Sequence, residues 1–205
     1  MNFRERLKNL VLANKISIRG TQNSFLNYGL LNKTNVFVEG SYNSILIKKK
    51  RSFENAVIKI RGDNNNVIFE EGGYHRGTFI YIVGNRLTLR IGKDTCTYSG
   101  DISVGGDSVN LDIGQNCLFA KEVVVRTSDS HKIYANDDSL INVPKSVSIG
   151  DHVWIGYRSI ILKGVHIGNE TVITAGAVVT KSFGPNSLIG GVPAKLLKEG
   201  IYWKR

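Results

Sequence analysis

The sequence predicts an all-β solenoid built from short parallel strands. Between residues 149 and 183 an aliphatic residue returns at every sixth position, a spacing that suits neither an α-helix nor an ordinary strand. The series comprises Ile149, Ile155, Ile161, Ile167, Ile173 and Val179. Glycine or threonine follows most of these residues, as suits tight corners between strands. Repetition at a fixed period is typical of solenoids, in which equivalent residues of successive coils stack on one another.

A second repeat, with a step of 22 residues, occupies the first half of the chain. In each copy two alternating apolar residues lead to a glycine, at Gly40, Gly62, Gly84 and Gly106. The alternation predicts a strand with one buried face, and the glycine with the polar residue after it predicts a turn. A weaker copy ending at Gly20 is offset by 20 residues. Since 22 is three sixes plus four, we expect each copy to be one three-sided coil with a few extra residues at a corner.

The longest interruption of this rhythm lies at residues 127–146. The aliphatic series runs through Ile113, Phe119 and Val125, stops, and resumes at Ile149, which is 24 residues or four sixes after Val125. The core is therefore expected to stay in register while a loop leaves the body. Long loops on rigid scaffolds commonly carry function.

The two ends of the chain differ from the repeats. Residues 3–14 place Phe3, Leu7, Leu10 and Val11 on one face of an amphipathic helix, which we expect to cap the first coil. The predicted organisation is an N-terminal helical cap at residues 1–15, one β-helix domain at residues 16–198 with the protruding loop, and a tail at residues 199–205. We expect the tail to pack back over the end.

The composition favours a protein of the cell interior. No long apolar run occurs, so neither a signal peptide nor a membrane span is expected. Without an export signal, the two cysteines, Cys96 and Cys117, are expected to be buried thiols in a reducing compartment. The predicted location is therefore cytoplasmic.

The net charge of +10 favours a polyanionic partner. Nucleic acid, an acidic lipid surface, an acidic polysaccharide and a phosphorylated cofactor would all fit this charge. No recognition helix or aromatic-rich nucleic-acid motif accompanies it, so we expect no nucleic-acid partner. The basic run from Lys48 to Arg51 is interpreted as a solvated corner loop.

Four segments of the C-terminal half resemble the hexapeptide-repeat acyltransferases. They read IGDHVWIG at residues 149–156, GVHIG at 164–168, AGAVVTK at 175–181 and GGVPAK at 190–195. The likeness extends from about Ile113 to Lys198 and is strong to sugar O-acetyltransferases such as the galactoside, maltose and capsular polysaccharide enzymes. The resemblance implies a left-handed parallel β-helix, acetyl-CoA as donor, and a homotrimer with active sites between neighbouring subunits. The left hand comes only from the resemblance, because ordinary crossovers are right-handed.

Acetylation of a sugar hydroxyl needs a base for the hydroxyl proton and an acid for the departing thiolate. Histidine, with an ordinary pKa of about 6.5, can serve as both. The chain contains His75, His131, His152 and His166. His131 lies in the interruption, four residues after Thr127, and this context matches the catalytic histidine of the resembled family. We expect His131 to be catalytic and the other three histidines to be structural. Asp129 or a backbone carbonyl could orient the imidazole.

The resemblance also places the two substrates. The candidate donor-site residues are Tyr157, Ala175, Thr180, Lys181, Lys195 and Lys198, and the candidate acceptor-site residues are Asp101, Trp154 and Asp129. The first two match positions that hold the pantetheine arm. The other four donor residues match positions near the nucleotide and its phosphates, where lysine charges are favourable. A buried packing role is the alternative for Trp154.

The sequence therefore predicts an acetyl-CoA-dependent sugar O-acetyltransferase that acts on a capsular or other surface polysaccharide or its precursor. No serine or cysteine stands beside a base, so direct transfer is expected rather than an acyl-enzyme. A γ-type carbonic anhydrase shares the fold but needs three zinc-binding histidines at short spacing, whereas the gaps here are 56, 21 and 14 residues, and no metal is expected. N-acetylation of an amino sugar nucleotide and a noncatalytic polyanion-binding solenoid stay open.

Overall fold

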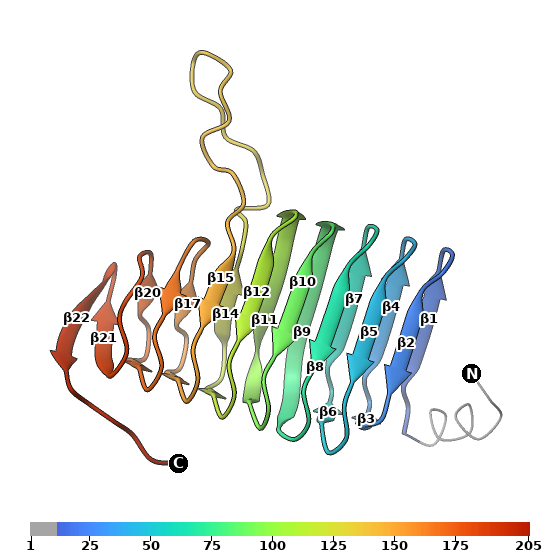
Figure 1. The fold of residues 1–205 in the computed structure, drawn as a ribbon, viewed down its shortest axis with the longest axis horizontal. Coiled ribbons are helices and arrows are strands. Elements are labelled where there is room, and N and C mark those ends of the chain that lie inside the picture. The colour runs from blue at the N-terminus through green and yellow to red at the C-terminus, as the bar shows by residue number, and fades with distance from the viewer. Residues whose placement is uncertain (1–11) are drawn as a thin grey trace.

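The chain forms a long three-sided prism of stacked coils, with one loop that projects from it (Figure 1). The computed structural model describes residues 12–205. The coils build three parallel ladders, which we call the first, second and third faces, and the long strands β9 and β11 run through both the third and the first. The coils run across the molecule from β1 near the N-terminus to β21 near the C-terminus.

The first face consists of β1 (Lys15–Arg19), β4 (Asn35–Glu39), β7 (Val57–Arg61), β9 (Tyr74–Asn85), β11 (Cys96–Asp107), β14 (Val123–Arg126), β17 (Ile160–Ile161) and β20 (Val178–Val179). The second face consists of β2 (Ser24–Asn27), β5 (Ser44–Ile47), β8 (Asn66–Phe69), β10 (Thr88–Ile91), β12 (Asn110–Ile113), β15 (Val147–Ile149) and β18 (His166–Ile167). The third face consists of β3 (Leu30–Asn32), β6 (Ser52–Glu54), the beginnings of β9 and β11, β13 (Leu118–Phe119), β16 (Trp154–Ile155), β19 (Val172–Ile173) and β21 (Ser187–Gly191).

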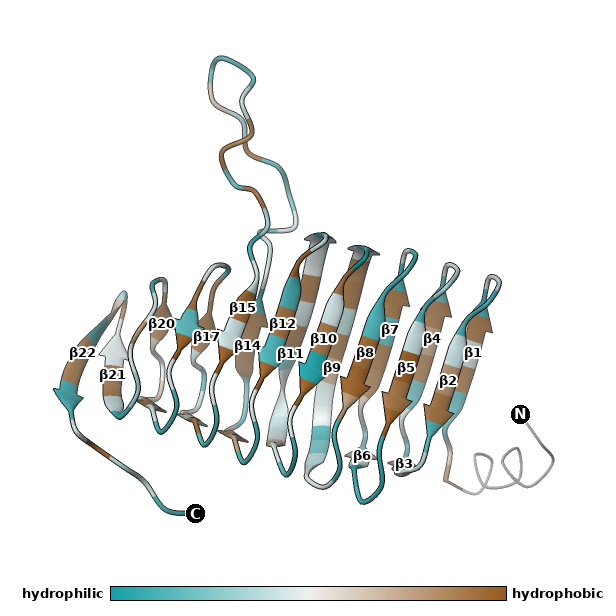
Figure 2. Ribbon diagram, in the orientation of Figure 1, coloured by the Kyte–Doolittle hydropathy of each residue, from teal (hydrophilic) through white to brown (hydrophobic). Residues whose placement is uncertain are grey.

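The predicted core is confirmed in register. Inward aliphatic residues of successive coils are direct partners, as in the pairing of Ile58 with Ile80 and of Ile80 with Ile102. These three side chains are at most 2% exposed. Burying one such side chain contributes on the order of 2 kcal/mol, so the stack is the main source of stability. Along the strands, brown apolar bands alternate with polar ones (Figure 2).

The extra residues of the 22-residue coils lie on the first face and at the corner that follows it. The first-face strands β4 and β7 have five residues each, whereas β17 and β20 have two. We call the corner between the first and second faces the loop corner. In the early coils it carries the predicted glycines, whose φ angles lie between 106° and 134° from Gly20 to Gly106. A Cβ at Gly62 would lie 2.0 Å from the carbonyl oxygen of Gly84, so only glycine fits this turn.

Residues 127–146 form the predicted loop, and it leaves the body at the loop corner (Figure 1). Ile149 pairs with Ile113, 36 residues earlier, while Ile167 pairs with Ile149, 18 residues earlier. The insertion is thus as long as one whole coil, and the core continues across it in register.

The ends of the chain agree with the prediction only in part. Most of the helix expected at residues 3–14 falls on residues 1–11, which lie outside the described residues, and Leu12 and Ala13 form a turn. At the other end β22 (Ala194–Glu199) folds back antiparallel on β21. The tail then runs back beside the coils rather than only over the last one, because Trp203 donates a hydrogen bond of 2.7 Å to the carbonyl oxygen of His152. The part of the chain that the structure describes contains no helix long and apolar enough to cross a membrane.

The interpretation of the basic run as a solvated corner is wrong for its last residue. Arg51 is fully buried, and its guanidinium donates hydrogen bonds of 2.7–2.8 Å to the carbonyl oxygens of Glu70, Thr95 and Gly92. Lys49 and Lys50 are exposed, as expected. Burial lowers the pKa of Arg51 to about 10, which leaves it charged at neutral pH. Cys96 and Cys117 are free and buried, as predicted.

Arg51 fixes the tautomer of the buried His75. Its Nη1 lies 3.3 Å from Nε2 of His75, and since arginine can only donate, Nε2 accepts. The proton therefore sits on Nδ1, which donates to Oγ1 of Thr97 at 2.9 Å. Burial, and then the charge of Arg51, hold the pKa of His75 well below its usual value.

Acid should destabilise the fold through His75. In the unfolded chain His75 binds a proton near pH 6.5, whereas in the folded chain it stays neutral to a lower pH. The stability present above pH 6.5 is therefore lost as the pH falls. We expect His75→Gln to reduce the slope of unfolding free energy against pH, between pH 6.5 and 5, by about 1 kcal/mol per pH unit. Urea unfolding at several pH values measures it. His131→Gln, at an exposed histidine, is the control, and equal slopes for wild type and His75→Gln would contradict the prediction.

Candidate active site

The base of the loop is clamped to the first face. The hydroxyl of Thr127 is buried, accepts a hydrogen bond of 2.8 Å from the backbone N–H of Gly105 and donates one of 3.1 Å to its carbonyl oxygen. The N–H of Lys145, where the chain returns, donates to the carbonyl oxygen of Thr127 at 2.9 Å. Both ends of the loop therefore have fixed positions on the prism.

A polar cluster of Asp129, Asn142 and Lys163 holds the next part of the loop. Asn142 donates to Oδ2 of Asp129 at 3.0 Å, and Nζ of Lys163 hydrogen bonds to the same oxygen. Lys163 also donates to the carbonyl oxygen of Asn142 at 2.9 Å. The Lys163 ammonium lowers the pKa of Asp129, ahead of a smaller effect of Asn142. The cluster joins the outgoing and the returning segment of the loop to the turn after β17.

His131 lies directly beyond this cluster. Its backbone N–H donates to the carbonyl oxygen of Asp129 at 2.8 Å, and its own carbonyl accepts 2.8 Å from Nδ2 of Asn142. The backbone of His131 is thus held at both its N–H and its carbonyl group. The imidazole is exposed and makes no hydrogen bond to any side chain or backbone group among residues 12–205. The carboxylate of Asp129 faces Lys163 and Asn142, so it is engaged in holding the loop.

The other three histidines have structural partners. His75 is buried against Arg51 and Thr97. Nδ1 of His152 lies 2.7 Å from Oε2 of Glu170, and Nδ1 of His166 lies 2.6 Å from Oγ of Ser148. Among the four histidines, His131 is therefore the one whose imidazole has no hydrogen-bond partner within residues 12–205.

Tyr157 and Ala175 come together at the corner between the third and first faces, which we call the third corner. The N–H of Gly176 donates to the carbonyl oxygen of Tyr157 at 2.7 Å, which stacks the two turns. Ala175 is exposed, and a Cβ at Gly176 would meet no atom within 4 Å. The corner offers a bare backbone surface on which an extended pantetheine arm has room. Tyr157 itself donates to Glu122 at 3.1 Å.

The four other candidate donor residues lie elsewhere. Thr180 and Lys181 follow β20 at the loop corner, one coil beyond Lys163. Lys195 and Lys198 are exposed on β22, which pairs with β21 at the end of the third face. Within one chain, the first face separates the loop corner from the third corner, so the candidate donor residues do not form one continuous site.

The two remaining acceptor candidates are also apart. Asp101 points outward from the first face, where Ser103 donates to its Oδ1 at 2.5 Å and Nη2 of Arg126 lies 3.4 Å from its Oδ2. Trp154 is 41% exposed on the third face. It is therefore not the buried packing residue that was the alternative.

Sequence reasoning missed the residue beside Trp154. Trp203 of the tail stacks on the His152 ring, with centroids 4.2 Å apart and an interplanar angle of 7°, and its centroid lies 5.9 Å from that of Trp154. The sequence contains no pattern that predicts this contact, because the contact depends on the path of the tail, which lies outside the repeats. Among residues 12–205, no three His, Cys, Asp or Glu side chains gather as metal ligands would.

Comparisons with known proteins agree with this fold. The family model described as the hexapeptide repeat of succinyl-transferase matches residues 146–181. The polysialic acid O-acetyltransferase of Neisseria meningitidis is 34% identical over 178 residues, which cover 86% of this chain and 82% of that protein. The chain therefore belongs to the hexapeptide-repeat acyltransferases, whose fold is the left-handed β-helix. The relatives it matches are named O-acetyltransferases, which favours an enzyme over a noncatalytic solenoid.

Further relatives support the same placement. The polysialic acid O-acetyltransferase of Escherichia coli O1:K1 is 32% identical over 125 residues, which cover 60% of this chain but 38% of that protein. The crystal structure of the polysialic acid O-acetyltransferase OatWY has a TM-score of 0.87 at 32% identity and covers 93% of this chain and 91% of that one. The polysialic-acid-specific acetyltransferase NeuO gives 0.75 at 30% identity, covering 94% of this chain and 89% of that one.

The role of the polar cluster in holding the loop can be tested by removing the charge of Asp129. Asp129→Asn removes the charge that holds Lys163, so His131 loses its fixed position. Because a displacement of about 1 Å can cost ~10²-fold in rate, we expect kcat/KM for acetyl transfer to fall by about that factor. Thermal unfolding should change little, because the cluster lies outside the core. Glu71→Gln, which breaks the comparable surface ion pair of Glu71 with Lys93, should leave transfer unchanged. Wild-type transfer by Asp129→Asn would contradict the prediction.

Proposed function

We propose that the protein transfers an acetyl group from acetyl-CoA to a hydroxyl group of an acidic capsular or other surface polysaccharide, with His131 as general base. The observation that carries the proposal is the imidazole of His131, which is exposed and has no partner among residues 12–205, on a loop that is fixed at its base. The names of the relatives favour a sialic acid polymer as the acceptor. The net charge of +10 favours an acidic acceptor on independent grounds.

In this mechanism the imidazole of His131 accepts the proton of the sugar hydroxyl as its oxygen attacks the thioester carbonyl. The carbon–sulfur bond then breaks, and the same proton passes from the imidazolium to the departing thiolate of CoA. The step needs no covalent enzyme intermediate. General base catalysis contributes about 10²–10⁴-fold, and holding both substrates in place contributes much of the rest.

The donor is proposed to lie against the third corner of one chain and the loop corner of another. The bare backbone at Ala175 and Gly176 fits the pantetheine arm, and Lys181 supplies charge for phosphate at the loop corner. These two corners are apart within one chain, but packing of neighbouring copies would bring the third corner of one against the loop corner of another. The loop itself exposes four apolar side chains at 44–61%, Ile133, Tyr134, Ile141 and Val143, as expected of a segment that packs against a neighbour. A homotrimer, as in the resembled family, satisfies this arrangement.

Replacing His131 tests the chemical step. We expect His131→Ala to lower kcat for acetyl transfer to polysialic acid by about 10²–10⁴-fold, because the hydroxyl proton loses its acceptor. Acetyl-CoA binding, measured by calorimetry, should stay near the wild-type value. His166→Ala, at an exposed histidine on the second face, is the matched control and should keep full activity. An active His131→Ala enzyme would remove the basis of the proposal.

Mixing variants tests whether neighbouring chains share the site. Ala175→Trp should block the third corner, and His131→Ala should disable the loop, so each variant alone is inactive. When the two are unfolded and refolded together, some interfaces combine an intact loop with an intact third corner. We expect transfer activity to return only in the mixture. If mixing restores nothing while mixed oligomers form, the site is built within one chain.

A further inference from the structure

The outward side of the first face carries an unusual surface in the N-terminal coils. Three cations and three aromatic rings lie together there, on neighbouring strands β1, β4, β7 and β9. We call this surface the platform, and it consists of Lys15, Arg19, Phe37, Lys59, Phe79 and Tyr81. None of these residues takes part in the site described above.

The platform is an ordered array. Phe37, Lys59 and Tyr81 are direct neighbours across three strands. Nζ of Lys59 lies 5.9 Å from the ring centroid of Tyr81, and Nζ of Lys15 lies 5.7 Å from that of Phe37. The rings of Phe79 and Tyr81 are 5.8 Å apart and tilted by 34°. Cations and rings therefore alternate at contact distance, as in sites that bind charged ligands with an apolar side.

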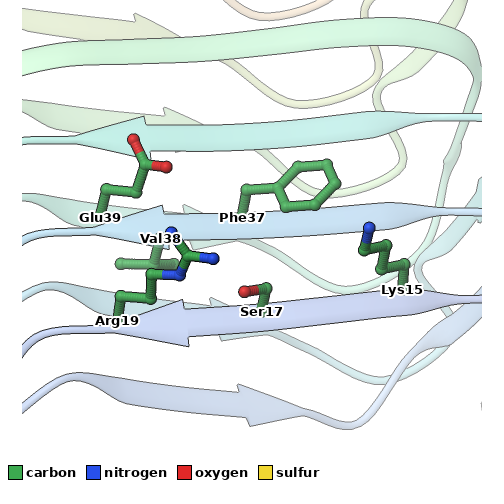
Figure 3. A pocket seen from close by; sticks show the side chains of 6 residues that line it. All are labelled: Lys15, Ser17, Arg19, Phe37, Val38 and Glu39. Carbon is green, nitrogen blue, oxygen red and sulfur yellow. The ribbon is translucent and has the colours of Figure 1, made fainter.

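One end of the platform is hollowed. Lys15, Ser17, Arg19, Phe37, Val38 and Glu39 line a pocket of about 220 Å³ on β1 and β4 (Figure 3). Lys15 and Arg19 stand at its two ends, with Phe37 on the neighbouring strand. Enclosed small-molecule sites usually measure about 300–1,000 Å³, so this hollow suits part of a longer ligand that continues along the face.

The charges of the platform favour an anion. Lys15, Arg19 and Lys59 form no ion pair within the described residues. Glu39 adds an acidic side chain at the pocket, but its carboxylate forms an ion pair of 2.8 Å with Nε of Arg61. That hydrogen bond lowers the pKa of Glu39, with smaller effects of Lys59 and Arg19. The surface is left with excess positive charge.

The platform is continuous with the base of the catalytic loop. One outward row passes from Arg19 through Glu39, Arg61 and Val83 to Gly105. Gly105 binds Thr127, and a Cβ on it would lie 2.5 Å from the hydroxyl of Ser128. The row crosses four strand spacings of about 4.8 Å, so it spans roughly 19 Å. An extended chain on this row leads to the segment that carries His131.

We propose that the platform binds a carboxylated polysaccharide chain, several sugar units away from the hydroxyl that is acetylated. Lysine and arginine would bind the carboxylates, and the rings would pack against the apolar faces of the sugars. The proposal rests on the proposed function for the identity of the polymer, but the binding it describes needs no acetyl transfer. It makes the enzyme favour long acceptors, because each chain is held at two places.

The other candidate occupant is a second copy of this chain. Association through this face would bring Lys15, Arg19 and Lys59 of each copy toward those of the next, and a net charge of +10 on each chain opposes it further. The acidic polymer instead neutralises these cations. The charge of the platform therefore favours the polymer.

The test compares wild type with the double variant Lys59→Ala/Tyr81→Ala. The matched control is Tyr28→Ala/Lys49→Ala, which removes the same two residue types from an exposed corner between the second and third faces. Binding of polysialic acid and of its carboxyl-reduced form is measured without acetyl-CoA, by calorimetry at two salt concentrations. The ratio of kcat/KM for the polymer to kcat/KM for a disaccharide acceptor is measured in parallel.

We expect the double variant to bind polysialic acid about tenfold more weakly, with a smaller salt dependence, and to lose about tenfold in the polymer-to-disaccharide ratio. The control should behave as wild type, and the carboxyl-reduced polymer should bind weakly to all three proteins. If the protein binds the polymer but transfers acetyl to no sugar, the proposed function is contradicted and the platform proposal is supported. Unchanged polymer binding in the double variant overturns the platform alone. A change of oligomeric mass in light scattering also overturns it, since the face would then be an interface between copies.

Discussion

The structure depends on one constraint, which is that every coil must place its inward aliphatic side chains directly over those of the coil before it. Ile58, Ile80 and Ile102 form one such column on the first face, and Ile149 and Ile167 belong to another on the second. The parallel ladders enforce this alignment, because each strand bonds to both neighbours in a single register. A coil can vary only where it does not touch the columns, so change is confined to the corners and the outward side chains.

The corners show how this constraint distributes polar groups. At the loop corner, Asn43 and Asn65 stack in a buried ladder, in which Nδ2 of Asn65 donates to Oδ1 of Asn43 at 3.0 Å. At the corner between the second and third faces, the guanidinium of Arg51 donates hydrogen bonds to three backbone carbonyls of the turns that point inward. Burying these groups unpaired would cost several kcal/mol, so each turn brings its own partner. The 18-residue insertion is tolerated for the same reason, since Thr127 and Asp129 bind its ends to groups of the adjoining coils.

Most of the fold could be predicted from the sequence, because the residues of each column recur at a fixed spacing along the chain. The position of the loop, and of His131 within it, followed from the place where this periodicity is interrupted. Arg51 could not be predicted, because a buried arginine and an exposed one look alike at the end of a basic run. Lys163 and Trp203 were missed for another reason: each contact joins a residue of the repeats to one outside them, and the two residues lie 34 and 51 positions apart, respectively. The platform also escaped notice, since outward positions do not have to repeat.

A filled column of aliphatic side chains leaves no interior room for a substrate, and this decides where chemistry can occur. The buried positions of the coils are occupied by apolar side chains or by satisfied polar groups, and no buried side-chain polar atom of the described residues lacks a partner. A binding site must therefore be made from the outside of the prism, and a convex corner cannot enclose a ligand by itself. In the proposed site the loop would supply one wall, with His131 beyond its anchored base, and a second copy of the chain would supply the other. The long uniform faces are then free to hold the rest of a polymer, which an enzyme with an internal pocket could not do.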